Sequence, residues 1–204
     1  MNKRFTLIEM DCNHIKSVVA IHLKAFSGFF LSFLGSNFLR VFYSGVIEDP
    51  SGIAYVVLDH NNLVGFVAGS SHPNGFFKRM LTKKWIKFGF AALPAILSDP
   101  RIVPRLLRAV TLPNQELPQS NCGTLLSIAV DPDCQGGGIG SKLVTAFLEE
   151  AKELGLDAIN LTTDAVNNEK TNQFYRRLGF DLYRNYKTPE GRSINEYIYH
   201  LENI

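Results

Sequence analysis

Cysteine is scarce in this chain of 204 residues, which contains only Cys12, Cys122 and Cys134. The number is odd and no two cysteines have the spacing of a metal-binding pair, so the sequence predicts neither a disulfide framework nor a metal site. This usage favours a reducing compartment, and we expect a cytoplasmic protein. The basic start of the chain, Met1–Phe5, leads into no long apolar run, so we expect no signal peptide.

Long hydrophobic runs and an excess of one charge are also missing. The longest uncharged stretch considered, residues 25–39, contains serine, glycine and asparagine and is too short and too polar to span a membrane. The formal net charge of +2 does not favour a nucleic-acid partner. With 46% hydrophobic and 20% charged residues the composition is that of an ordinary globular protein, and we expect residues 1–204 to form one domain.

One stretch carries the strongest chemical signal. Residues 125–130 (LLSIAV) form a short apolar run typical of a buried strand, and Asp131-Pro132 ends it as a turn. A glycine-rich loop follows and leads into a helix whose apolar residues recur at helical spacing: Ile139, Leu143, Val144, Phe147, Leu148, Ala151 and Leu154. The first N–H groups of a helix have no internal partner, and the helix dipole is positive there. This entrance therefore predicts a phosphate or pyrophosphate site.

Two well-known phosphate loops do not fit this stretch. A P-loop requires lysine directly after its last glycine, and here Ser141 comes before Lys142. A Rossmann turn requires a third glycine where Ser141 stands. The pattern that remains is Q-x-x-G-x-G, carried by Gln135, Gly138 and Gly140. A flexible loop between a strand and a helix would also explain the glycines when they are taken alone.

A second motif follows the next expected strand, residues 158–163. Residues 167–180 match N-x-x-A-x-x-F-Y-x-x-x-G-F, with Thr171 where alanine is usual, at Asn168, Phe174, Tyr175, Gly179 and Phe180. Together the two motifs cover about residues 123–181 and resemble those of the GNAT N-acetyltransferase superfamily. The resemblance implies acetyl-CoA as the cofactor and coenzyme A as a product.

The remaining apolar pattern agrees with the fold that this resemblance implies. We expect strands at residues 5–10, 53–58, 63–68, 180–186 and 194–201, with helices around 15–26 and 30–45. The resemblance implies a mixed α/β (α+β) fold. In it, helices flank a central, mostly antiparallel sheet of about seven strands.

Residues of about 73–118 are additional to that fold, and we expect a basic helical insertion before the cofactor strand. Between Ser71 and Val110 eight Lys and Arg accompany one acid, whereas the rest of the chain has thirteen bases and eighteen acids. One expected helix has an apolar face (Phe77, Met80, Leu81, Trp85, Phe88) opposite a basic one (Arg79, Lys83, Lys87), and a second surrounds Ile102, Leu106 and Leu107. This insertion is either a lid with a solvated basic face or a surface for an anionic partner, including peripheral membrane contact.

The resemblance also implies roles within the site. The backbone of Ile128, Ala129 and Val130 would pair with the pantetheine arm. The pyrophosphate would bind the amides of Gln135, Gly136, Gly137, Gly138, Ile139, Gly140 and Ser141. The N–H of Ile128 would face the thioester oxygen, and Tyr175 would protonate the departing thiolate. Asn168 would contact the cofactor or cap the helix that begins at Glu169.

The resemblance implies that a carboxylate on the cofactor strand often acts as the general base, but residues 125–130 contain neither an acid nor a histidine. The base therefore stays unassigned, and the candidates elsewhere are His22, His72, Asp164 and Glu196. We expect acetyl transfer to the primary amine of a small acceptor by direct attack in a ternary complex. An amino sugar on a nucleotide or lipid carrier is one candidate acceptor. The alternatives are an O-acyltransferase, an enzyme for longer acyl groups, and an acyl-CoA-binding protein without catalysis.

Overall fold

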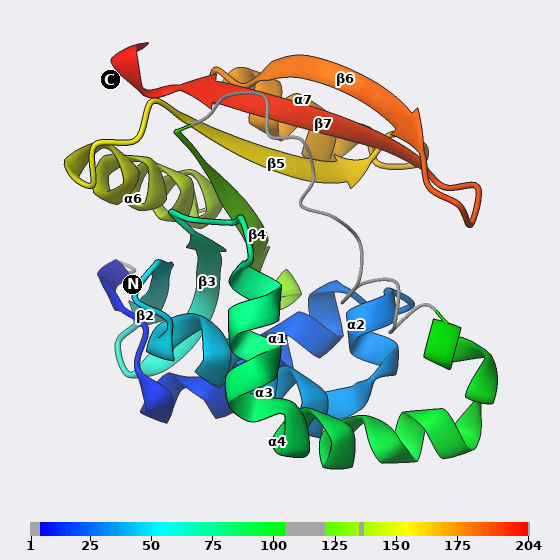
Figure 1. The fold of residues 1–204 in the computed structure, drawn as a ribbon. Coiled ribbons are helices and arrows are strands. Elements are labelled where there is room, and N and C mark those ends of the chain that lie inside the picture. Colours follow the sequence, from blue (N-terminus) through cyan, green and yellow to red (C-terminus); the bar gives the residue numbers. More distant parts are fainter. Residues whose placement is uncertain (1–4, 105–120, 135–136, 204) are drawn as a thin grey trace.

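A single seven-stranded sheet forms the centre of the fold (Figure 1). The computed structural model describes residues 5–104, 121–134 and 137–203 of the chain. The strand order is β1-β2-β3-β4-β5-β7-β6, and all neighbours are antiparallel except β4 and β5, which run parallel. This confirms the predicted mixed α/β fold with a mostly antiparallel sheet.

The strands begin and end within a few residues of the predicted positions. They are β1 (Phe5–Glu9), β2 (Gly52–Asp59), β3 (Asn62–Ser70), β4 (Cys122–Val130), β5 (Ala158–Asp164), β6 (Asp181–Lys187) and β7 (Ser193–His200). β2 and β3 form the predicted hairpin, in whose turn His60 adopts a left-handed φ of 58°.

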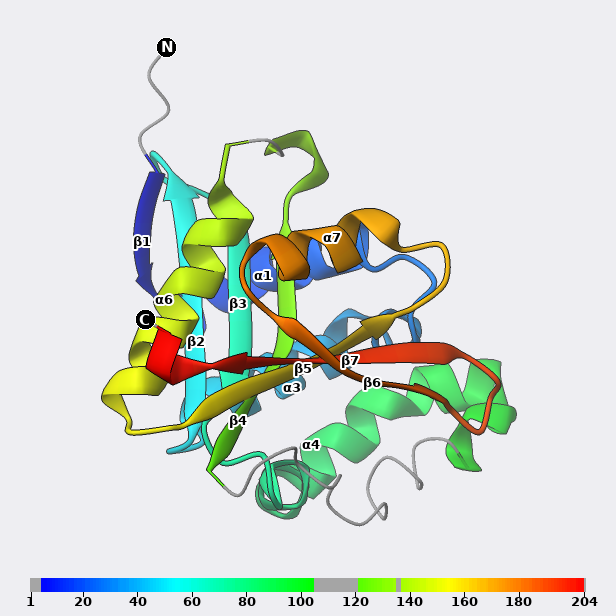
Figure 2. The same cartoon turned by 90° about the horizontal axis from the view of Figure 1, so that it is seen from above.

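Helices cover both faces of the sheet (Figure 2). One face carries α1 (Ile15–Ala25), α2 (Phe30–Phe33), α3 (Gly35–Glu48) and α4 (Phe76–Ser98). The other carries α6 (Ile139–Glu153) and α7 (Glu169–Arg177). Short 3-10 turns lie at η1 (Cys12–His14), η2 (Pro100–Ile102), η3 (Pro132–Cys134) and η4 (Leu201–Asn203). Among the helices described, none is long and apolar enough to cross a bilayer.

The alternation of side chains along the strands produces the two larger apolar cores of the described structure. Val56 and Phe66 face α1, α3 and α4, whereas their neighbours Val57 and Val67 face α6. Successive strand residues point to opposite faces of a sheet, so each central strand contributes to both cores. The helix predicted around residues 30–45 is in fact two helices, α2 and α3, because Gly35 adopts a left-handed φ of 87° at the start of α3.

The predicted faces of the inserted helix are partly wrong. Phe76, Met80 and Phe88 are buried, whereas Phe77 and Trp85 are 41% and 69% exposed. Lys84 has non-helical angles (φ −127°, ψ 21°), so α4 consists of two segments whose faces are rotated relative to each other. Of the predicted second basic helix, Ile102 lies in η2, and Leu106 and Leu107 lie outside the described residues.

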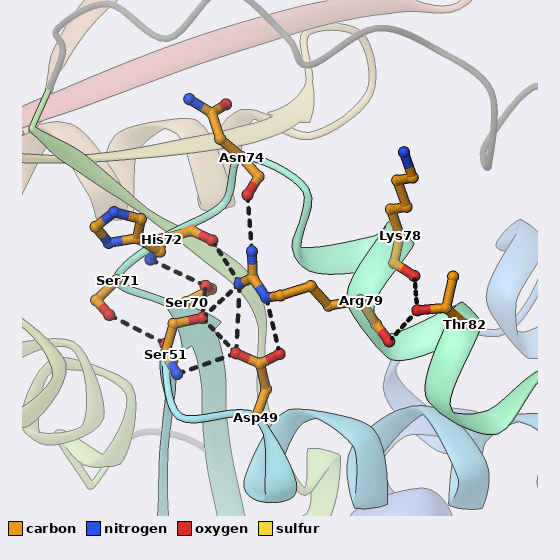
Figure 3. A network of polar contacts seen from close by, with 9 residues as sticks. All are labelled: Asp49, Ser51, Ser70, Ser71, His72, Asn74, Lys78, Arg79 and Thr82. Carbon is orange, nitrogen blue, oxygen red and sulfur yellow. Dashed lines mark hydrogen bonds and ion pairs between the residues drawn. The ribbon is translucent and has the colours of Figure 1, made fainter.

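A polar network around Asp49 fixes the first segment of α4 to the corner between α3 and β2 (Figure 3). Arg79 donates from Nε to Asp49 Oδ2 at 3.2 Å, and the hydroxyl of Ser51 donates to Asp49 Oδ1 at 2.6 Å. Arg79 also donates to the carbonyls of His72 and Asn74. The prediction that Arg79 belongs to a solvated basic face is therefore wrong. Lys83 and Lys87, which were predicted on the same face, are exposed.

The charge of Asp49 contributes to stability in a pH-dependent way. Burial alone would raise the pKa of this carboxyl, but the hydrogen bonds from Arg79 and Ser51 outweigh burial and lower the pKa from 3.8 to about 2. A folded-state pKa below that of the unfolded chain means that the stabilisation is complete above about pH 4 and is lost as the pH falls towards 2.

We expect Asp49→Asn to lower the free energy of unfolding by about 2 kcal/mol at neutral pH, because the ion pair with Arg79 is lost. Urea denaturation at a series of pH values measures the effect, and the difference from wild type should shrink below about pH 4. The matched control is Asp181→Asn, since Asp181 is exposed. A difference that does not change with pH would contradict this role of the Asp49 charge.

Candidate functional site

The sheet is open between β4 and β5. These parallel strands pair only from Cys122–Ala158 to Leu125–Leu161. Beyond that point β4 continues to Val130 and β5 to Asp164 without pairing to each other. The gap between the two strands therefore lies at their C-terminal ends, where a parallel pair would otherwise continue.

The open side of β4 presents main-chain groups to this gap. The N–H of Asp131 donates to the carbonyl of Val64 at 2.8 Å, which sets the alternation of hydrogen bonds between β3 and β4. In this phase Ile128 and Val130 direct their N–H and C=O groups away from β3, towards β5. Ala129 has the opposite phase, so its groups point to β3.

The glycine-rich loop forms the entrance of α6. Gly138 is the N-cap with a left-handed φ of 71°, and a Cβ built there would meet no atom within 4 Å. No side chain caps the first turn of α6 in the described structure. The first intrahelical bond runs from the N–H of Lys142 to the carbonyl of Gly138, which leaves the amides of Ile139, Gly140 and Ser141 without helical partners.

The two sequence motifs meet at this entrance. A Cβ on Gly140 would lie 3.2 Å from the ring of Phe174, so the glycine allows α7 to approach the first turn of α6. Gly137 is exposed, although a Cβ there would lie 2.9 Å from the ring of Phe5. Of the predicted pyrophosphate ligands, Gln135 and Gly136 lie outside the described residues.

Tyr175 is buried on α7, close to the same entrance. Its ring packs against Phe174, Phe180 and Tyr197, with centroids 5.3, 5.6 and 6.1 Å away. Burial raises the pKa of the phenol, which therefore keeps its proton at neutral pH. In the described part of the chain its hydroxyl forms no hydrogen bond, unlike that of Tyr197, which donates to Asn172 at 2.9 Å.

Asn168 occupies the N-cap position of α7, but its side chain does not cap the helix. Its Nδ2 donates to Thr163 Oγ1 at 2.8 Å and to the Asp164 carbonyl at 3.3 Å. Asn172, one turn later, donates to the same carbonyl at 2.9 Å. Both asparagines thus fix α7 to the end of β5.

A pocket of about 440 Å³ lies on the α2 side of the sheet, next to the end of β5. Its walls come from four separate segments: Ser27, Gly28, Phe29, Phe30 and Phe33; Asp99 and Ile102; Asp164; and Arg192. Arg192 Nη2 donates to both oxygens of Asp164 at 2.7 and 2.8 Å, and its guanidinium lies 5.4 Å from the centroid of the Phe29 ring. The pocket thus combines aromatic rings with two carboxylates and one guanidinium.

Sequence reasoning missed most of this pocket. Phe29, Asp99 and Arg192 were not predicted as site residues, because they lie far apart in the sequence and carry no motif. The only local signal was the run of phenylalanines between residues 26 and 33. Asp164 was considered only as a base, and it does line the pocket.

Two other candidate bases are buried in structural networks. His22 is hydrogen-bonded through Nδ1 to the Tyr43 hydroxyl at 2.7 Å, which in turn lies 3.0 Å from Ser127 Oγ on β4. Burial lowers the pKa of His22 to about 4, so the imidazole is neutral at physiological pH. Glu196 is fully buried and receives hydrogen bonds from Arg184 and Asn160.

Comparison with known proteins agrees with this geometry. The sequence profile of the Acetyltransferase (GNAT) family matches residues 18–180. Mycothiol acetyltransferase of Pseudarthrobacter chlorophenolicus is 41% identical over 58 residues, which are 28% of this chain and 18% of that protein. The chain therefore matches less than a fifth of the length of this curated relative.

Solved structures show the same fold at low sequence identity. The ribosomal-protein-S18-alanine N-acetyltransferase of Escherichia coli superposes with a TM-score of 0.60 at 17% identity, covering 97% of this chain and 94% of the other. The polyamine N-acetyltransferase of Drosophila melanogaster gives a TM-score of 0.57 at 16% identity, covering 97% and 100%. With the family profile spanning most of the sequence, these findings establish that the chain belongs to the GNAT family of acetyltransferases.

Proposed function

We propose that this protein transfers the acetyl group of acetyl-CoA to the primary amine of a small acceptor, by direct attack in a ternary complex. The observation that carries the proposal is the gap between β4 and β5, which lies beside the uncapped start of α6 and ends at the pocket near Asp164. The cofactor would enter along α6, and the acceptor would enter from the opposite face of the sheet.

The cofactor would bind through main-chain groups. The amides of Gly138, Ile139, Gly140 and Ser141 lie at the positive end of the α6 dipole, which suits a pyrophosphate. The pantetheine arm carries amides of its own and would pair with the outward-facing groups of Ile128 and Val130 as an added strand. Asn168 does not cap α7, but its Nδ2 is engaged by Thr163, so it supports the site by fixing α7.

The reaction needs little acid–base machinery beyond these groups. The amine attacks the thioester carbonyl, a C–N bond forms, and the oxygen takes negative charge that the N–H of Ile128 would stabilise. One such donor contributes about 3 kcal/mol in the transition state. The C–S bond then breaks, and the phenol of Tyr175 would protonate the thiolate of coenzyme A. The acceptor ammonium would lose one proton before attack and a second one after it, both to water, since Arg192 donates to both oxygens of Asp164. One of these two protons would return to the phenolate of Tyr175, which restores the acid for the next turnover.

The pocket supports an acceptor that carries an amine. Phe29 and Phe33 offer aromatic faces, and Asp99 adds a carboxylate with no arginine paired to it in the described structure. Such a lining attracts ammonium groups through ion pairing and cation–π contact. The solved Drosophila relative is named as a polyamine acetyltransferase, which agrees with this class. An amino sugar on a carrier stays a prediction, as does the cytoplasmic location inferred from three free cysteines.

The cofactor site is tested by adding a negative charge at the α6 entrance. Acetyl-CoA should raise the melting temperature of the wild type, and Gly138→Asp should abolish this rise by repelling the pyrophosphate. Gly138→Asn is the matched control, because asparagine tolerates the left-handed conformation as well as aspartate does. We expect it to bind at least about tenfold more tightly than Gly138→Asp.

A second control separates this effect from backbone strain. Gly155 lies at the other end of α6, has a φ of 75° and would accept a Cβ without contacts within 4 Å. Gly155→Asp should lower the melting temperature of the free protein yet leave the rise with acetyl-CoA intact. Unchanged cofactor binding by Gly138→Asp would refute the assignment.

The catalytic role of Tyr175 distinguishes an enzyme from an acyl-CoA-binding protein. We expect Tyr175→Phe to lower kcat about a hundredfold while leaving acetyl-CoA affinity nearly unchanged. Release of free thiol with a panel of amines measures turnover. Tyr197→Phe is the control, because it removes another buried hydroxyl, one that donates to Asn172. Equal turnover by wild type and Tyr175→Phe would mean that Tyr175 only packs.

The acceptor pocket is tested at Asp99. Its Oδ1 caps η2 by accepting from the N–H of Arg101 at 3.0 Å, and asparagine can keep this hydrogen bond while removing the charge. We expect Asp99→Asn to raise KM for a cationic amine about fivefold and to leave KM for acetyl-CoA unchanged. Asp157→Asn, at an exposed carboxylate that precedes β5 and so lies at the opposite end of the strand from Asp164, should change neither value. Identical KM values for wild type and Asp99→Asn would place the acceptor elsewhere.

A further inference from the structure

We propose that the second segment of α4 lies on the surface of an anionic lipid bilayer and attaches the protein to it peripherally. The segment follows the irregular residue Lys84 and ends at Ser98. Figure 1 shows α4 along the edge of the molecule, on the opposite side of the fold from β6 and β7. The inference concerns binding to a surface and does not depend on the acetyl transfer proposed above.

This segment is apolar on two opposite faces. Phe88, Ala91, Ala92 and Ala95 are buried and face the core. A second row of apolar side chains, the outer ridge, recurs every three or four residues on the face turned away from that core. It consists of Ile86, Phe90, Leu93 and Leu97, with exposed fractions of 52%, 74%, 46% and 74%. Exposed apolar rows of this kind mark an interaction surface in a folded protein.

The charges next to the outer ridge select an anionic partner. α4 contains no Asp or Glu. Lys87 is exposed next to the ridge residues Ile86 and Phe90 on the same segment, and Lys83 is exposed just before the segment begins. Lys84, by contrast, forms an ion pair with Glu48, and Arg79 forms one with Asp49. Trp85, the only tryptophan of the chain, is 69% exposed at the start of the segment. Lysine, tryptophan and aliphatic residues together are typical of helices that lie in the interface of an anionic membrane.

Two other occupants of the ridge fit the charges less well. A second copy packed on the same face about a two-fold axis would bring the lysines of both copies together, which is unfavourable. Residues 105–120 of the chain itself carry two arginines and one glutamate, so they offer Lys83 and Lys87 no net negative charge. A bilayer with anionic headgroups supplies both an apolar layer for the ridge and negative charge for the lysines.

Trp85 makes the proposal directly measurable. Titration of the full chain with vesicles of equimolar phosphatidylcholine and phosphatidylserine should shift the tryptophan emission to shorter wavelength and co-sediment the protein. Vesicles of phosphatidylcholine alone should bind much more weakly, and added salt should weaken binding to the mixed vesicles. Absence of both co-sedimentation and the spectral shift with the mixed vesicles would overturn the proposal.

The variants identify the surface that binds. The double variant Phe90→Ser, Leu97→Ser keeps Trp85 as the reporter and should bind at least about tenfold more weakly. Leu93→Ser should weaken binding, whereas Leu182→Ser on β6 should not, although both leucines are 46% exposed. Lys83→Gln and Lys87→Gln should each cost about fivefold, and Lys187→Gln, at an exposed lysine of β6, should have no effect.

Two results would overturn the assignment of the ridge. Binding that is unchanged in Phe90→Ser, Leu97→Ser would show that lipids are bound elsewhere. The second result would come from sedimentation equilibrium of the free protein. If the wild type is a dimer and the same double variant is a monomer, the ridge is an interface between two copies. Unfolding curves for all variants should match wild type, because every substituted side chain is exposed.

Discussion

The incomplete pairing of β4 and β5 is the constraint on which the site depends. A backbone N–H or C=O that is neither paired nor solvated is costly, so a sheet does not open in its interior without a reason. Here the pairing stops after Leu125 and Leu161, and the phase of β4 turns the groups of Ile128 and Val130 into the gap. A ligand that carries amides of its own can form hydrogen bonds with these unpaired main-chain groups, and the pantetheine arm of acetyl-CoA is such a ligand.

The gap is maintained because the two strand ends are held by different parts of the molecule. Asp131, just after β4, is bonded to Val64 on β3 and forms an ion pair with Lys24 on α1 at 3.1 Å. The side chain of Asp164, at the end of β5, accepts hydrogen bonds from Arg192 in the β6–β7 turn. Its main-chain carbonyl accepts hydrogen bonds from Asn168 and Asn172 at the start of α7. The contacts of Asp131 therefore hold the end of β4 against β3 and α1, whereas those of Asp164 hold the end of β5 against α7 and the β6–β7 turn. Closing the gap would break contacts on both sides.

The features that depend on neighbouring residues in the sequence could be predicted from it. The strands follow from apolar alternation, and the entrance of α6 follows from glycines that act within one turn of the chain. The pocket could not be predicted in this way, because Phe29, Asp99 and Arg192 come together only when the sheet and helices are assembled. The faces of α4 were mispredicted for a related reason. A regular helical period was assumed across Lys84, where the backbone is not helical, and Arg79 was counted as solvated although Asp49 binds it.

The charge imbalance of the insertion divides into a structural part and a surface part. Arg79 and Lys84 are paired with acids of the α3 end, so they attach α4 to the fold. Lys83 and Lys87 are exposed on the same helix as the outer ridge, whose apolar side chains are also exposed in the described structure. Asp99, the C-cap residue of α4, lines the pocket that we propose for the acceptor. A bilayer bound along α4 would therefore be attached to the protein through the same helix whose C-cap lines this pocket.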